Sequence, residues 1–367
     1  MGRSTTLLSI GITLAVVFFH AESSVADAKA RWGSAVLRQG PEWYASAEAR
    51  AMADAVIQYQ SPHGGWPKNT DLGEPPASAE ALARLNKSGV ADTIDNGATI
   101  LPMRFLARVA AGSGDERCRA AVVRGVDYLL ASQYPNGGFP QFYPLRDHGY
   151  YSHITYNDGA MINALDVLRD VAEGEQPFAF IDANRRARAA DAVRRGIDCI
   201  LKTQIRQNGK LTAWCAQHDE KTLEPTWART YEPPSLSGAE SVGVVRFLME
   251  IEKPGPEVVA AIEGAVAWFR AVAIPGVRLE DFTAADGKKD RRLVADPAAE
   301  PLWARFYELG TNRPVFLGRD SVVHYAIAEI EPERRNGYSY YGSSPAPLLA
   351  RDYPRWRAKQ VASGSLE

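Results

Sequence analysis

A unit built around a Gly-Ala pair recurs three times, and it constrains the fold more than any other feature of the chain. Its copies read DNGATILPMRFLARVA from Asp95, NDGAMINALDVLRDVA from Asn157 and LSGAESVGVVRFLMEI from Leu236. Each copy is expected to open a helix, because its apolar residues recur at helical spacing. A second helical segment follows each copy, and these segments read RCRAAVVRGVDYLLASQ, ARAADAVRRGIDCILKTQ and PEVVAAIEGAVAWFRAVA.

Helix pairs repeated in this way cannot bury their apolar faces alone and must stack on their neighbours. We therefore expect an all-α-dominated (α/α)3 toroid or barrel of three helical hairpins, with long loops and a few short strands. The segment DSVVHYAIAEI over residues 320–330 is a candidate for one such strand. The intervening segments 70–92, 141–156 and 205–235 are longer than connections need to be, so they are expected to build the functional face.

A second repeated element ends the helices. It reads QYQSPHGGWPKN over residues 58–69, SQYPNGGFPQFYP over 132–144 and, more faintly, KTQIRQNGKLTAW over 202–214. Glycine accepts the left-handed conformation at the end of a helix, and proline prevents its continuation. The aromatic residues after the diglycines, Trp66 and Phe139, are expected to pack these turns rather than to touch a ligand.

The N-terminus has the order of a secretory signal. Basic Arg3 precedes the apolar run LLSIGITLAVVFF and the small residues SSVADA, which fits cleavage after Ala26 or Ala28. We expect a secreted or periplasmic protein, no stable membrane association and most simply a monomer. The domains predicted are a signal peptide over 1–28, a single catalytic domain over 29–345 and a partly disordered tail over 346–367.

The charge and the cysteines exclude several classes of protein. A formal net charge of −2 offers no field to attract nucleic acid. Cys118, Cys199 and Cys215 are too few for a disulfide scaffold and have no zinc-site spacing, so they are interpreted as small buried residues. The histidines His63, His148, His153, His218 and His324 show no metal-binding spacing and are interpreted as structural. The chain has no GxSxG, P-loop or GxGxxG motif.

The three repeated units differ just before the Gly-Ala pair, and this difference points to chemistry. The first unit has Asp95 and Asn96, the second has Asn157 and Asp158, and the third has no acidic residue there. Asp and Asn are common helix caps. A carboxylate with an amide at the mouths of two adjacent hairpins also supplies the hard oxygen ligands that suit Ca²⁺.

Basic residues are gathered in the segments expected on the same face. Lys68 follows GGWP, and Arg229 stands in TWARTYEPPS beside Tyr231. Further arginines lie in ARFYELGTNRPVFLGRD, at positions Arg305, Arg313 and Arg319. Arginine is suited to bidentate recognition of carboxylates. The pattern predicts a cation-lined site for an anionic ligand beside a hard metal ion.

Five ordered blocks carry a family resemblance. TIDNGAT, YPNGGFPQFYP, ITYNDGAM, TWARTYEPPSLSG and ERRNGYSYYG together resemble the pectate lyases of polysaccharide lyase family ten, from about residue 45 to 345. The resemblance implies an (α/α)3 toroid, a Ca²⁺ cofactor and cleavage of α-1,4-polygalacturonate by β-elimination to 4,5-unsaturated oligogalacturonides.

The resemblance also implies roles for individual residues. Asp95, Asn96 and Asp158 correspond to the calcium site, and Arg229 to the catalytic base. Lys68, Arg313, Arg305 and Tyr231 are expected to contact the substrate. Because arginine normally titrates above about pH 12, a base of this kind implies an alkaline optimum.

Three alternatives remain open at this stage. An inverting glycoside hydrolase could use Asp95 and Asp158 as acid and base, with carboxyl groups about 6.5 to 9.5 Å apart. A terpene-cyclase-like toroid would share the Gln-Gly-aromatic turns, but its acidic Asp-x-Asp-Asp motif is missing from the sequence. A pectin-binding protein without catalytic activity is the third.

Overall fold

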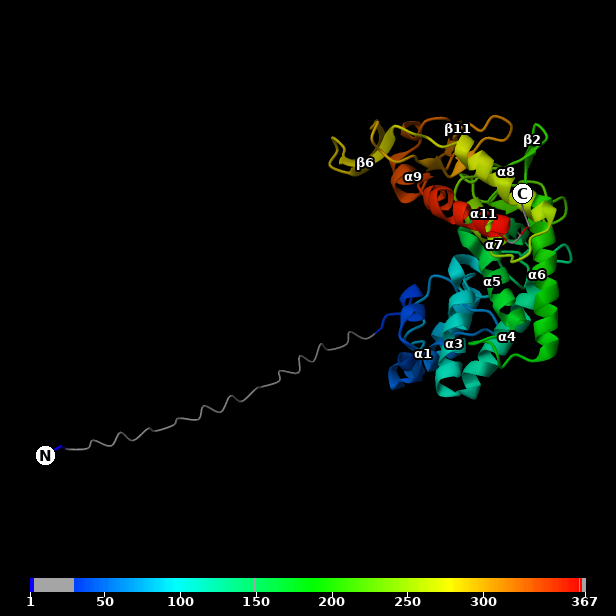
Figure 1. The fold of residues 1–367 in the computed structure, drawn as a ribbon, viewed down its shortest axis with the longest axis vertical. Coiled ribbons are helices and arrows are strands. Elements are labelled where there is room, and N and C mark those ends of the chain that lie inside the picture. The colour runs from blue at the N-terminus through cyan, green and yellow to red at the C-terminus, as the bar shows by residue number, and fades with distance from the viewer. Residues whose placement is uncertain (3–29, 148, 363, 365–367) are drawn as a thin grey trace. The chain divides into compact units, whose positions relative to one another are not determined.

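Three helical hairpins form the centre of the fold, each built from one copy of the repeated unit and the helix after it. They are α3 (Ile100–Ser113) with α4 (Glu116–Ser132), α5 (Ala160–Glu173) with α6 (Ala183–Thr203), and α7 (Glu240–Met249) with α8 (Pro256–Ala271). The hairpins stack in chain order, because α5 contacts both α3 and α7, and α6 contacts both α4 and α8 (Figure 1). This arrangement confirms the predicted fold class.

The computed structural model describes residues 1–2, 30–147, 149–362 and 364. The predicted signal peptide over 1–28 lies outside the described residues except for its first two, and all elements below belong to the unit Arg31–Glu367. Before the first hairpin come η1 (Ser34–Arg38), η2 (Pro41–Ala45), α1 (Ala47–Gln58) and α2 (Ala79–Lys87). Within the described residues, no helix is long and apolar enough to span a bilayer.

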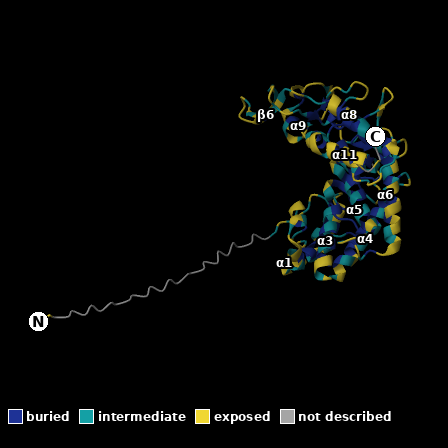
Figure 2. Cartoon of the chain, in the orientation of Figure 1, coloured by how far each residue is buried: buried dark blue, intermediate teal, exposed yellow. Residues whose placement is uncertain are grey.

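The helices begin and end where local chemistry dictates. Asp115 caps α4 and Asp182 caps α6, each accepting a hydrogen bond from a backbone N–H of the first turn. Gly114 and Gly174 end α3 and α5 in the left-handed conformation that glycine adopts without strain. The helices opened by the repeated unit are buried along most of their length, whereas the second helices keep an exposed face (Figure 2).

A glutamine at the end of one helix joins it to the second helix of the next hairpin. The Nε2 group of Gln60 donates to the carbonyls of Gly64 and Ala121, both at 2.9 Å. Gln133 repeats the pattern with Gly137 and Ala192, and Gln204 repeats it with Thr212 and Ala261.

The aromatic residues of the same turns are enclosed. Trp66, Phe139 and Trp214 are fully buried. Trp66 donates to the carbonyl of Val56 at 2.8 Å, and Trp214 donates to that of Ile200 at 2.7 Å. The prediction that Trp66 and Phe139 pack their turns is confirmed.

The described strands form two-stranded antiparallel pairs only. The one long pair is the hairpin β6 (Val277–Thr283) with β7 (Lys289–Ala295). The short pairs are β1 (Ile154–Thr155) with β4 (Gln217–His218), β2 (Arg206–Gln207) with β3 (Lys210–Leu211), β5 (Leu236–Ser237) with β9 (Phe306–Tyr307), β8 (Trp303–Ala304) with β12 (Tyr341–Gly342), and β10 (Phe316–Leu317) with β11 (Val323–His324). The strand predicted within 320–330 is limited to β11, because the helical turn η6 (Ile327–Glu329) follows it.

The C-terminal segment differs from the partly disordered tail expected after residue 345. It forms α10 (Pro345–Pro347), the π-helical turn η7 (Leu348–Asp352) and α11 (Tyr353–Ala362), after the short helix α9 (Pro332–Gly337). Tyr353 and Trp356 are buried, and the Tyr353 hydroxyl donates to Glu263 on α8 at 2.6 Å. Aromatic burial therefore holds this segment in place at least as far as residue 362.

The three cysteines are free and buried, as predicted. Burial raises the pKa of the Cys118 and Cys199 thiols to about 12, so neither forms a thiolate near neutral pH. His218 is fully buried, which lowers its pKa to about 4. Its ring nitrogens contact the backbone N–H of Cys215 and the carbonyl of Leu223, which confirms a structural role for this histidine.

Candidate active site

Two short turns at the mouths of the first and second hairpins lie against each other. They are η3 (Asp95–Gly97) and η5 (Asn157–Gly159), and each leads into the first helix of its hairpin. Asn96 and Asp158 both have left-handed backbone geometry, with φ of 52° and 51°. Asn and Asp tolerate this conformation better than other residues that carry a Cβ atom. The two turns thus share one shape, and their side chains occupy equivalent positions.

In each turn the first residue is buried and paired with a cation. Asp95 is 4% exposed, and its Oδ2 lies 2.5 Å from Lys68 Nζ. Asn157 is 5% exposed, and its Oδ1 accepts a hydrogen bond from Arg305 Nη2 at 3.0 Å. The second residue of each turn, Asn96 or Asp158, faces solvent. The two acids predicted to share a metal ion therefore occupy different positions: Asp95 the inner one and Asp158 the outer one.

The third unit contributes a buried carboxylate that the sequence analysis missed. Glu240 directly follows the third Gly-Ala pair and accepts a hydrogen bond from Arg305 Nη2 and another from the Ser237 hydroxyl. Arg305 Nη2 also lies 3.6 Å from Asp158 Oδ1. Arg305 therefore joins the second and third units. Its position could not be predicted, because the sequence alone does not show which residues face each other across this loop.

The charges around Asp158 shift its titration. Desolvation by the surrounding protein raises the pKa of this carboxyl, Arg305 opposes the rise, and the neighbouring carboxylates Glu240 and Asp95 add to it. Carboxylates from the first and third units therefore both repel the charged form of Asp158. A divalent cation would relieve that repulsion.

Arg229 belongs to a second charged group in the long segment before β5. Its Nε and Nη2 atoms donate to the two carboxylate oxygens of Glu232, at 2.8 and 2.5 Å. The Tyr338 hydroxyl also donates to Glu232, at 2.8 Å. Burial alone would lower the pKa of the Arg229 guanidinium, but the hydrogen bonds and charge of Glu232 outweigh it, so the pKa lies above its ordinary value.

The charges of both groups influence the titration of Tyr150. Burial raises the pKa of its hydroxyl to about 12, with Arg229 opposing and with Glu232 and Asp95 adding to the rise. Tyr338 links the two groups geometrically, because its ring centre lies 4.8 Å from the Arg305 guanidinium and 5.7 Å from that of Arg229. The structure therefore brings into one region the side chains of Lys68, Asp95, Asp158, Arg305 and Arg229.

The other predicted substrate contacts have different surroundings. Arg313 is exposed, and its guanidinium lies 3.6 Å from the ring centre of Tyr325. Among the described residues, no contact of its side chain with the charged region is found. Tyr231 is 6% exposed and belongs to a hydrophobic cluster with Phe306 and Phe316. Its ring lies 5.0 Å from the Arg229 guanidinium, which it supports. The substrate roles of both residues stay predictions.

The chain is similar to known proteins in both sequence and fold. The model of the family described as Pectic acid lyase matches residues 60–349. The chain belongs to this family. A solved family 10 polysaccharide lyase from Cellvibrio cellulosa is 37% identical, with a TM-score of 0.73, and the match covers 87% of this chain and 95% of that one.

A second solved structure is a single-residue variant of the family 10 lyase from the same organism, in complex with trigalacturonic acid. It is 37% identical, with a TM-score of 0.72 and coverage of 86% of this chain and 95% of that one. No match to a curated protein was found. Membership of this family and the similarity to solved polysaccharide lyases identify the protein as a polysaccharide lyase.

The residues predicted to hold calcium fit a hard cation. Asp95 Oδ1 is a buried oxygen for which no hydrogen-bond partner is found among the described residues. An unpartnered buried carboxylate oxygen is costly unless a cation approaches it. Asp158 keeps 43% of its side chain exposed, and Asn96 adds an exposed amide. Oxygen-only ligands of this kind favour Ca²⁺.

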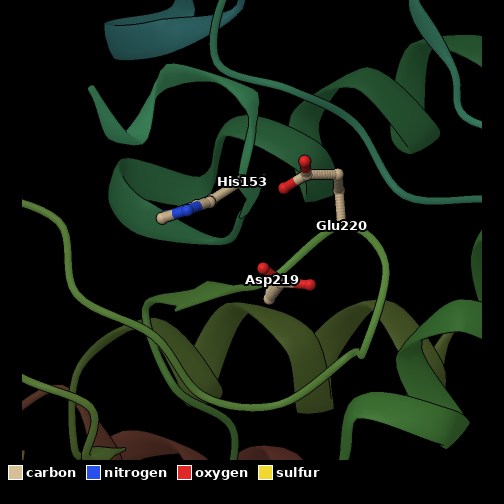
Figure 3. A group of neighbouring side chains, drawn as sticks. All are labelled: His153, Asp219 and Glu220. Carbon is tan, nitrogen blue, oxygen red and sulfur yellow. The ribbon is translucent and has the colours of Figure 1, made fainter. Parts of the chain in front are cut away.

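A different group of possible metal ligands lies elsewhere in the pectic acid lyase. His153, Asp219 and Glu220 each offer a ligand atom, and these atoms lie within 4.8 Å of one another (Figure 3). The antiparallel register of β1 and β4 pairs Ile154 with His218, which brings the residue before β1 opposite the residue after β4. The spacing of histidines in the sequence could not predict that His153 and Asp219 lie opposite each other. Asp219 Oδ1 already accepts two backbone hydrogen bonds from its own turn, so the group alone indicates no function.

Glu232, Glu240 and Tyr150 are the charged or polar residues that sequence reasoning missed at this site. Glu232 stands three residues after Arg229, inside a segment already singled out. Glu240 occupies the place after the Gly-Ala pair where the first unit has Thr99 and the second has Met161. A comparison of the three units one position further would have identified Glu240.

Proposed function

We propose that this pectic acid lyase cleaves α-1,4-polygalacturonate by calcium-assisted β-elimination and releases 4,5-unsaturated oligogalacturonides. The observation that carries the proposal is a buried oxygen of Asp95 without a hydrogen-bond partner among the described residues, in a turn that contacts the turn of Asp158. Lys68 pairs with Asp95, Arg305 lies near Asp158, and the Tyr338 ring links Arg305 to Arg229. Family membership and the trigalacturonic acid bound to a 37%-identical relative support polygalacturonate as the substrate.

The reaction requires removal of the C5 proton next to a carboxylate and loss of the C4 oxygen. The main difficulty is negative charge that develops on the uronate carboxylate. Asp95, Asp158 and Asn96 would hold the calcium ion. When bound, calcium supplies Lewis-acid stabilisation of that charge.

The cationic side chains would bind and orient the polymer. Lys68 and Arg305 are held in place by Asp95, Asn157 and Glu240, so their positions are set before the substrate arrives. Such preorganised cations fix the register of the uronate units relative to the base. Arg313 would contribute from the exposed loop between β9 and β10.

Arg229 remains the proposed base. Because it is paired with Glu232, its guanidinium must lose a proton before it can act as a base. In the described structure the guanidinium is held in its charged form, because the pKa is raised. Removal of the C5 proton requires the neutral form, which becomes more populated as the pH rises. The proposal therefore predicts activity that increases toward alkaline pH.

The products test the proposal directly. Polygalacturonate treated with the protein should yield unsaturated ends that absorb ultraviolet light, and EDTA should abolish their formation. An inverting hydrolase that uses Asp95 and Asp158 as acid and base would release reducing ends without this absorbance and would survive EDTA. That second result would refute β-elimination.

The leader sequence supports export, so we propose that the enzyme acts as a secreted or periplasmic monomer without stable membrane association. Recovery of the processed protein outside the cytoplasm, with the mass of one chain in size-exclusion chromatography with light scattering, would support this. Retention of the unprocessed chain in the membrane fraction would contradict it.

A further inference from the structure

A hollow of about 350 Å³ lies beside the candidate active site and shares two residues with it. Lys68 and Asn96 form the shared side, and Trp32 contributes from the segment before η1. The hollow is large enough for a small ligand, since ligand pockets begin at about 300 Å³. It therefore extends the site toward the N-terminal segment of the described domain.

The lining separates into an apolar part and a polar part. The apolar part consists of Trp32, Pro67, Leu72, Ala98, Leu101 and Pro102. The polar part consists of Lys68, Asn69, Thr70, Asp71 and Asn96. Asn96 Nδ2 donates to Asn69 Oδ1 at 3.1 Å, which fixes two of the amides relative to each other.

We propose that this hollow is a sugar-binding subsite in which Trp32 packs against one pyranose ring of the polymer. A pyranose presents C–H groups on its faces and hydroxyl groups on its edge, so it matches an aromatic surface bordered by amides and a hydroxyl. The Asp71 carboxylate accepts hydrogen bonds from hydroxyl groups and repels a uronate carboxylate. The bound unit therefore points its carboxylate away from Asp71.

Trp32 is held in a way that suits this role. Its ring meets Phe105 edge to face, with centroids 5.7 Å apart and planes at 81°, and Phe105 is fully buried. The Trp32 ring is only partly buried, so the contact with Phe105 supports it while part of its surface stays accessible. Trp32 also precedes residues 60–349, which match the family, so the subsite depends on a segment outside that match.

The test measures affinity for oligogalacturonides from dimer to hexamer by isothermal titration calorimetry. The inference rests on the proposed function, since it takes polygalacturonate as the ligand. The affinity of the wild-type protein should increase once the oligogalacturonide is long enough for one of its sugar units to occupy the hollow. Trp32→Ala should lose that increase, about 3- to 10-fold in Kd, which is the range expected for one aromatic contact. Trp32→Phe should keep part of it.

Trp43→Ala is the matched control, because Trp43 also packs on Phe105, at 6.0 Å, but does not line the hollow. It should bind every oligomer like the wild type. If Trp32→Ala fails to fold, Trp32→Phe decides the question, since a subsite requires a smaller length-dependent gain in that variant. The subsite is overturned if both Trp32 variants fold and bind every length as the wild type does.

The subsite and the proposed function can fail separately. Wild-type formation of unsaturated products with no Trp32 effect on Kd would refute the subsite and leave the lyase reaction intact. Length-dependent binding that requires Trp32, without unsaturated products, would support the subsite and refute β-elimination.

Discussion

Equivalent residues of the repeated units have different charged partners at this site. Asp95 and Asn157 occupy equivalent buried positions, yet one pairs with Lys68 and the other with Arg305. The Asp95 carboxylate is neutralised by the Lys68 ammonium group, whereas the uncharged amide of Asn157 leaves the charge of Arg305 available to Glu240. The asymmetry places one carboxylate inside the site and the second, Asp158, at its surface.

Replacement of Lys68 by methionine tests whether the buried Asp95 carboxylate depends on this ammonium group. Without the ammonium group, the buried Asp95 carboxylate lacks a charged partner, which costs about 3–5 kcal/mol in unfolding free energy. Calcium should recover more stability in Lys68→Met than in the wild type, because it would bind a carboxylate that no longer has a competing cation. Urea unfolding with and without calcium measures both effects.

Lys253→Met serves as the control, since Lys253 is exposed and should change the unfolding free energy by less than about 0.5 kcal/mol. If calcium leaves the unfolding of the wild type and Lys68→Met unchanged, no calcium binds at Asp95.

Glu232→Gln should change the pH dependence of catalysis. Glu232 raises the pKa of Arg229 in the folded protein, so its loss should lower that pKa. The neutral form of Arg229 then appears at lower pH, and the rising limb of the profile of kcat/KM should move toward lower pH. Glu333→Gln is the control, because Glu333 pairs with Arg319 and Arg334. Identical profiles for the wild type and Glu232→Gln would remove Arg229 from the role of base.

At the scale of elements, the repeated glutamine explains why the chain interrupts its helices at a similar motif each time. Gln60, Gln133 and Gln204 each satisfy a carbonyl of their own turn and a carbonyl of the second helix of the next hairpin. The turn therefore ends one helix and positions the following hairpin.

Gln133→Leu tests this linkage at nearly constant volume. Loss of its bonds to Gly137 at 3.0 Å and Ala192 at 2.8 Å leaves two carbonyls without their donor, which should cost about 1–3 kcal/mol. Urea denaturation should show a lower midpoint with an unchanged slope. Gln58→Leu is the control, because exposed Gln58 bonds only within its own helix. Equal midpoints for both variants would show that the glutamine does not join the hairpins.

The helices could be predicted from sequence because their period is local, but the β6–β7 hairpin could not be recognised by alternating apolar residues. Its strands carry charge on exposed positions, and pairs such as Arg291 with Asp281 stabilise it across the strands. The signal that remained was the turn, where Asp286 and Gly287 stand between the strands. For the same reason the pairing of Arg305 with Glu240 was missed, because charge pairing across a long separation leaves no period in the sequence.

For the whole molecule, the site depends on stacking of all three hairpins. Asp95, Asp158 and Glu240 come from three different units, and the first and third reach Asp158 because η5 contacts both η3 and α7. The resemblance in the sequence predicted the first two acids and three of the cations. It could not supply Glu240, whose role arises from the packing of the third unit.

The calcium dependence of product formation by the wild type and Asp158→Asn tests the central claim most directly. Unsaturated product is followed by ultraviolet absorbance as the calcium concentration is increased in metal-free buffer. We predict that Asp158→Asn needs at least about 10-fold more calcium for half-maximal activity, equivalent to about 1.4 kcal/mol of binding free energy. Activity that is independent of calcium in the wild type, or a curve that Asp158→Asn leaves unchanged, would contradict the account.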